Sequence, residues 1–138
     1  MKEKLKTLQY LHLFLLGGVV MAYVFMGNFG ESNSFQLPHL DGESLTFFAL
    51  PIASILIGQL VFHNALKRID SRATFEDKFA AYQSASIIRW ASVEGAAFII
   101  LFVMPEYASL GFFVILLLLI LRPSATRMEN DLNVTLRD

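Results

Sequence analysis

The sequence predicts an all-α integral membrane protein, a four-helix bundle with both termini in the cytoplasm. Three observations predict it: the composition, four long apolar segments and a one-sided distribution of basic residues. Of the 138 residues, 55% are hydrophobic and only 17% are charged, and the mean hydropathy is +0.54. A soluble domain of this length would carry more charge and shorter apolar runs.

Four segments are apolar enough to be membrane-spanning helices, each of which needs roughly 20 largely apolar residues. We expect helices over residues 8–26, 45–66, 79–103 and 107–121. The fourth would be only about 22 Å long at the helical rise per residue. It spans a bilayer if Arg122 snorkels or the bilayer thins locally. The four helices use up the chain, so residues 1–138 are predicted to form a single transmembrane domain.

The basic residues predict how the chain is threaded. Ten of the eleven Lys and Arg residues come before the first span, between the second and third, or after the fourth. The segment 27–44, between the first two spans, has no basic residue but contains Glu31, Asp41 and Glu43. By the positive-inside rule, both ends are then cytoplasmic and the protein is multi-pass in the inner (plasma) membrane. The first apolar run lacks a small-x-small cleavage site, which argues against a signal peptide.

Polar side chains inside the predicted spans are the candidate functional residues. Arg89 and Glu94 lie within the third span, where a charge costs several kcal/mol unless it is paired or faces a polar interior. Five residues turn a helix by about 500°, so these two side chains are roughly 140° apart around the axis. On the second span, Gln59 and His63 share a face because they are four residues apart. The predicted intramembrane polar site consists of Arg89, Glu94, Gln59, His63, His12 and Ser92.

Small residues mark the expected helix contacts. Gly17 and Gly18 at the centre of the first span permit close helix approach. Ala91 and Gly95 form a small-xxx-small pair on the third span, which is also the most polar of the four. Such a helix belongs at the centre of a bundle or at an oligomer interface.

The search for chemistry-bearing motifs gives no catalytic residues. No metal-ligand cluster, phosphate-binding loop or nucleophile–base set is visible, and the chain has no cysteine. Haem held by His12 and His63 is the one cofactor to consider, but their depths differ and no supporting motif accompanies them. We therefore expect no enzyme, no cofactor, no metal and no nucleic-acid partner. The tail after Pro123 is expected to be an extended docking strand.

A resemblance is carried by the third span and the end of the chain. Tyr82-x6-Arg89-Trp90-x3-Glu94-Gly95-Ala96, followed by Arg122-Pro123 and Asp131-Leu132, resembles a family of small four-helix bacterial integral membrane proteins. The resemblance implies that Arg89, Glu94, Arg122 and Pro123 are defining positions, and it implies no activity.

Two functions remain open from the sequence. The first is a non-enzymatic accessory or assembly subunit that lies in the lipid bilayer and uses the third helix to form a homo-oligomer or to dock other membrane subunits. The second is a small transporter or proton-coupled channel that uses Glu94 with Arg89. In its mid-helix carboxylate, the chain loosely resembles the proteolipid subunit of rotary ATP synthases, which would fit this second function. This chain lacks the glycine ladder of that subunit and has four predicted crossings instead of two.

Overall fold

The computed structural model describes residues 2–27 and 41–133. Most of the acidic segment 27–44, including Glu31, lies outside the described residues. The described part is helical: α1 (Lys2–Met26), α2 (Gly42–Lys67), α3 (Phe75–Val103), a 3-10 turn η1 (Pro105–Tyr107), α4 (Ala108–Ile120) and α5 (Ala125–Leu132). The first three helices begin several residues earlier than the apolar runs because polar and charged residues extend them beyond the apolar segments.

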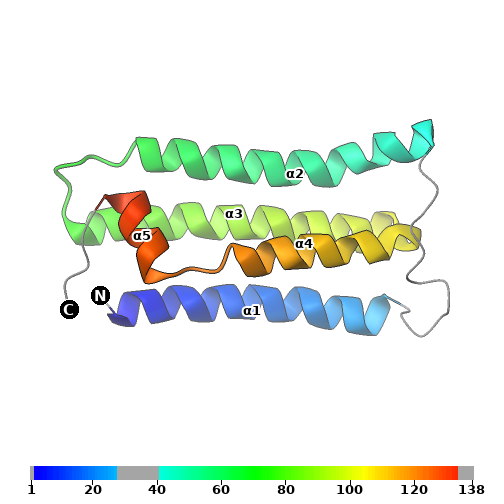
Figure 1. Ribbon diagram of the computed structural model, residues 1–138, viewed down its shortest axis with the longest axis horizontal. Helices are drawn as coiled ribbons and strands as arrows, with labels where there is room; N and C mark the ends of the chain where they lie inside the picture. Colours follow the sequence, from blue (N-terminus) through cyan, green and yellow to red (C-terminus); the bar gives the residue numbers. More distant parts are fainter. Residues whose placement is uncertain (1, 28–40, 134–138) are drawn as a thin grey trace.

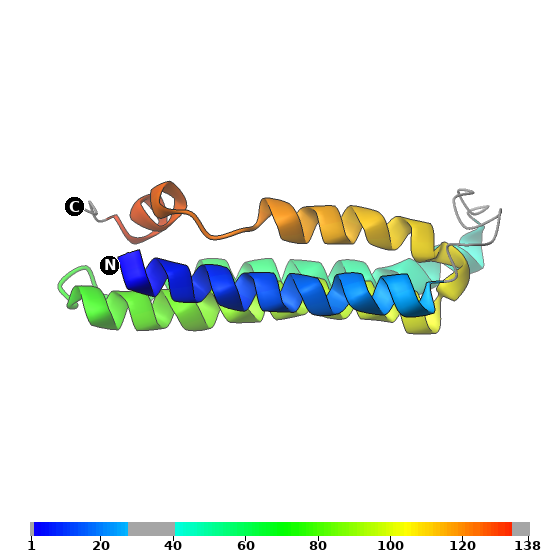
Figure 2. The same ribbon diagram turned by 90° about the horizontal axis from the view of Figure 1, so that it is seen from below.

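Helix α3 is the central element of the bundle. It contacts α1, α2 and α4, and its buried side chains recur along its length from Phe79 to Leu101. Helices α1, α3 and α2 lie side by side in one layer, and α4 and α5 cover one face of that layer (Figures 1 and 2). The start of α1, the 68–74 connection and α5 lie at the same end of the bundle, which we call the terminal end.

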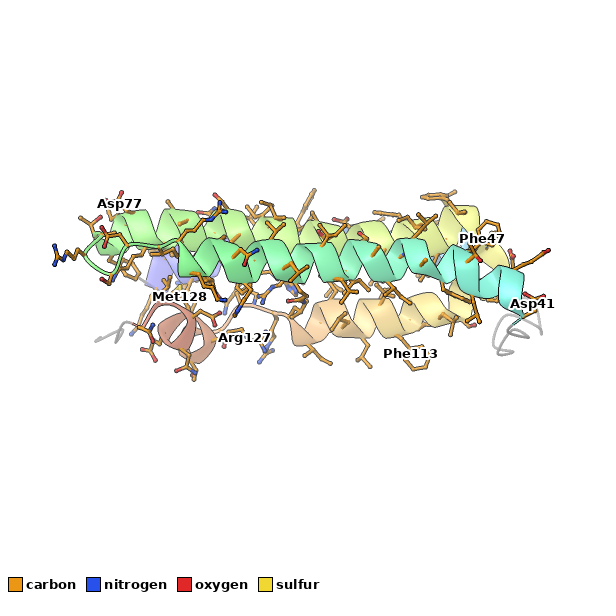
Figure 3. The ribbon with its side chains drawn as sticks, turned by 90° about the horizontal axis from the view of Figure 1, so that it is seen from above. Asp41, Phe47, Asp77, Phe113, Arg127 and Met128 are labelled. Atoms are coloured by element: carbon orange, nitrogen blue, oxygen red, sulfur yellow. The ribbon has the colours of Figure 1, made fainter. Side chains whose placement is uncertain are left out.

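Three helices are long and apolar enough to cross a membrane: Lys2–Met26, Leu45–Lys67 and Phe75–Val103. A fourth crossing requires the chain from Pro105 to Leu132 to count as one span, although it bends by 73° between α4 and α5. Large apolar side chains are exposed around the outside of the bundle. Phe113 on α4, for example, points away from the other helices (Figure 3) and is 64% exposed.

The tail after Pro123 is the clearest correction to the sequence analysis. It does not continue as an extended strand but folds into α5. Ser124 caps the helix because its hydroxyl accepts a hydrogen bond from the Arg127 N–H, and Asn133 ends it in the left-handed conformation. Met128 and Leu132, four residues apart on one face, are buried in the same core as Leu8, Phe62 and Tyr82. Helix α5 is therefore an integral part of the bundle at its terminal end.

Candidate functional site

Helix α3 holds the central polar side chains because its start is well defined and its interior is rich in small residues. Thr74 caps the helix by accepting a hydrogen bond from the Asp77 N–H at 3.2 Å, and the acidic first turn complements the helix dipole. From this start, Tyr82, Ser86 and Arg89 fall on one buried face at spacings of four and three residues. That face looks toward α2, α4 and α5.

Arg89 is built into the interior at the terminal half of the bundle. Its side chain is 6% exposed, and its guanidinium carbon lies 3.7 Å from the centroid of the Phe62 ring on α2. This geometry is a close cation–π contact. The carboxylate of Asp131 on α5 attracts the guanidinium and accepts a hydrogen bond from the Tyr82 hydroxyl at 3.3 Å. The Arg89 Nε has no hydrogen-bond partner among the described residues.

Glu94 has different surroundings from Arg89. Its side chain is half-buried at the α1 side of α3, and its Oε1 lies 3.8 Å from where a Cβ on Gly18 would stand. Gly18 is itself exposed, so the missing side chain leaves the carboxylate beside an open notch in α1. Within residues 2–27 and 41–133, Glu94 forms no ion pair and no hydrogen bond. The structure therefore brings Arg89 and Glu94 to different neighbours.

The two histidines also lie in separate surroundings. His12 is buried; its Nε2 donates a hydrogen bond to the Leu118 carbonyl at 2.7 Å, and its ring packs edge-on against Trp90 at 5.0 Å. His63 is exposed on α2, and Gln59, one turn earlier, is half-buried. In the part of the chain that the structure describes, no group of three or more His, Cys, Asp or Glu side chains could hold a metal ion.

The end of α4 is a polar feature that the sequence analysis missed. The last carbonyls of a helix have no partner within it. Here side chains from three other helices supply the donors: His12 to Leu118, Arg127 to Ile120, Trp90 to Leu121 and Gln9 to Pro123. Helix α4 ends within the bundle because these donors satisfy its carbonyls. The only hint in the sequence was Arg122-Pro123, which ends the helix.

The tightest helix packing occurs at two glycines that the sequence analysis does not name, Gly58 and Gly111. A Cβ on Gly58 of α2 would collide with Ser92 of α3, and a Cβ on Gly111 of α4 would collide with the Tyr23 ring of α1. A Cβ added at Gly17 would have no neighbouring atom within 4 Å, and one added at Gly95 would lie 3.7 Å from the Ser54 hydroxyl oxygen. Ser54 in turn donates a hydrogen bond to the Ser92 carbonyl at 2.7 Å. Gly58 and Gly111 thus set the tightest approaches within the bundle.

One face of α3 remains uncovered, although α3 is the central helix. It lies on the side of the layer opposite α4 and α5. Its exposed residues are mostly small: Ala80, Ala81, Ser84, Ile88 and Ala91. Glu94 lies one turn beyond Ala91, at the edge of this face toward α1. We call this set the open face of α3.

Comparison with models of protein families, with curated proteins and with solved structures finds no match to this chain. The geometry described above is therefore the basis for the functional argument.

Proposed function

We propose that this chain is a non-enzymatic accessory or assembly subunit of the inner membrane, which forms oligomers or docks other membrane subunits through the open face of α3. The observation that carries the proposal is the open face itself. Central helices of bundles bury their small residues against neighbours, whereas here Ser84 and Ala91 are exposed. Small residues let a second helix approach closely within lipid, where packing and hydrogen bonds drive association.

Glu94 adds specificity to this face. A half-buried carboxylate in an apolar helix is costly without a hydrogen-bond donor or a cation. Neither Arg89 nor another described side chain supplies one to Glu94. A partner helix that carries a donor opposite Glu94 would satisfy the carboxylate and gain a charge-assisted hydrogen bond, which is stronger than a neutral one.

The surface and the charges support residence in a membrane. The outward residues of α1, α2 and α4 are large and apolar, among them Phe14 at 80% and Phe25 at 76% exposed. Basic residues lie on the elements of the terminal end or on the chain that leads from α4 to α5: Lys2, Lys4, Lys6, Arg68, Arg72, Arg122 and Arg127. With four crossings, this distribution favours a cytoplasmic location for both termini.

A matched pair of substitutions tests the role of the open face. Ala91→Phe places a bulky ring on it, whereas Ala53→Phe places the same ring on an exposed position of α2. We expect the wild-type protein, purified in mild detergent, to leave the membrane as an oligomer or with partner subunits. Light scattering after size exclusion should show Ala91→Phe as a smaller species and Ala53→Phe unchanged. A wild-type protein that is monomeric and without partners, or equal effects of both variants, would refute the proposal.

Proton-coupled transport is the second candidate, and the unpaired Glu94 carboxylate favours it. A proton carrier needs a polar route from that carboxylate to water. The buried polar group nearest to it in sequence, Arg89, lies roughly 140° away around α3 and has different neighbours. This separation makes assembly the better-supported function.

A further inference from the structure

A cleft of about 440 Å³ opens at the bend between α4 and α5. It lies between α1 and the chain that follows α4, outside the open face of α3. Leu13 and Leu16 of α1 and Leu119 of α4 form its apolar part, and Gln9, Arg122 and Ser124 supply polar groups. Its volume falls within the range of small-molecule sites in proteins, which is roughly 300–1,000 Å³.

The polar part of the cleft suits an anion. The side chain of Arg122 is exposed and forms neither an ion pair nor a hydrogen bond with any described residue. No acidic side chain is among the described residues that line the cleft. Gln9 is exposed and uses one N–H to bond the Pro123 carbonyl, so its second N–H is available. The Ser124 hydroxyl accepts from the Arg127 N–H and can still donate its own hydrogen.

The apolar part points to a ligand with a hydrocarbon chain. Leu13 is 61% exposed and Leu119 is 45% exposed, so the cleft opens on the apolar flank of the bundle. Along α1, Gln9 lies about 10 Å and Leu16 about 21 Å from Lys2 at the helical rise per residue. The polar groups are thus near the charged start of α1, and the leucines are deeper along the apolar helix. This order matches a lipid, with its headgroup at the interface and its chain toward the membrane interior.

We propose that this cleft binds one membrane phospholipid with an anionic headgroup, its phosphate against Arg122 and an acyl chain along Leu13, Leu16 and Leu119. Basic pockets between transmembrane helices on the cytoplasmic side select acidic lipids in this way. The proposal rests on the membrane location in the proposed function and is independent of assembly through α3. A bound lipid fills the space beside the bend and covers the end of α4.

Trp90, the single tryptophan of the chain, is a built-in reporter for the cleft. Its Nε1 donates to the Leu121 carbonyl, next to Arg122, and its ring contacts His12, which lines the cleft. A brominated acyl chain in the cleft should therefore quench Trp90 fluorescence. We propose measuring quenching in liposomes that contain brominated phosphatidylglycerol or brominated phosphatidylcholine in a matched, unbrominated background.

We expect about a five-fold preference for phosphatidylglycerol over phosphatidylcholine, the size expected of one basic residue near a membrane surface. Arg122→Gln should remove the preference, and Arg122→Lys should retain it. Arg72→Gln, which removes a cation in the 68–74 connection, should leave it intact. Trp90 emission without brominated lipid checks that each variant keeps its fold, which we expect because Arg122 is exposed.

Three results would overturn the proposal. Equal quenching by the two brominated lipids would show that the cleft does not select an anion. If Arg122→Gln and Arg72→Gln reduced the preference for phosphatidylglycerol equally, the preference would come from diffuse surface charge and not from a site. Displacement of brominated phosphatidylglycerol by soluble glycerol phosphate would identify a water-soluble ligand. A complete lack of quenching by either lipid, from a protein that co-floats with the liposomes, would show that no acyl chain enters the cleft. A protein that does not co-float with the liposomes would instead contradict the membrane location, which separates that failure from a failure of the cleft.

Discussion

Arg89 and Glu94 lie five residues apart on the same helix, but their side chains differ in burial and in neighbours. Arg89 is buried, stacks on Phe62 and is attracted by Asp131 of α5. Glu94 is half-buried beside the notch at Gly18 and has no partner among the described side chains. The difference indicates that Arg89 stabilises this bundle and that the Glu94 carboxylate is available to bind a group outside the bundle.

The largest expected effect follows from truncating the buried cation. Arg89→Ala removes the contact with Phe62, leaves a cavity beside Tyr82 and ends the attraction to Asp131. We expect the free energy of unfolding to fall by about 3 kcal/mol. Unfolding by a denaturing detergent, titrated into a mild one, measures the change. Glu94→Ala is the matched truncation and should cost less than about 1 kcal/mol. A larger loss in Glu94→Ala would reverse the roles assigned to the two residues.

A smaller and local effect is expected at α5. Asp131→Asn keeps an acceptor for the Tyr82 hydroxyl but loses the charge that attracts Arg89. We expect amide exchange in α5 to become about five-fold faster, since a charge attraction at a partly exposed site is worth at most about 1 kcal/mol. Glu106→Gln, at the opposite end of the bundle, serves as the control. Unchanged exchange in α5 would mean that the buried Met128 and Leu132 hold this helix without help from the charge pair.

The smallest effect on stability, with a clear effect on assembly, is expected for Glu94→Gln. The amide nearly matches the carboxylate in volume, so we expect the unfolding free energy to stay within about 0.5 kcal/mol of the wild type. Association through the open face should weaken by about ten-fold because a charge-assisted hydrogen bond becomes a neutral one. Size exclusion over a dilution series measures it. Transport would be favoured instead if the interior of liposomes containing the wild-type protein acidifies, while liposomes containing a Glu94→Gln variant of unchanged oligomer size show no acidification.

Much of the helical fold follows from the sequence, because long apolar runs and their polar ends define helices. The angular separation of Arg89 and Glu94 also follows from helix geometry alone. Helix α5 was missed, although Ser124 as a cap and the i, i+4 pair of Met128 and Leu132 were available signals. The sequence predicts an extended docking strand there because the segment is too short to fold alone.

The contacts between helices could not be predicted in the same way. Gly58 and Gly111 set the closest approaches, but a glycine carries no side chain that tells which neighbour it meets. Gly17 and Gly18 are equally suitable by sequence, yet the Cβ position of Gly17 has no atom of another residue within 4 Å and that of Gly18 meets only the Glu94 carboxylate at 3.8 Å. The donors that satisfy the end of α4 come from three helices that are distant in sequence, such as His12, 106 residues from Leu118. Only the tertiary arrangement brings them together.

A double-mutant cycle on Arg89 and Glu94 tests the central claim most directly. The claim is that the two charges have different neighbours and different roles. The unfolding free energies of Arg89→Ala, Glu94→Ala and the double variant should be additive within about 0.5 kcal/mol, as for sites with no shared partner. A coupling energy of about 1.5 kcal/mol or more would show that Arg89 and Glu94 compensate each other, and would contradict the account.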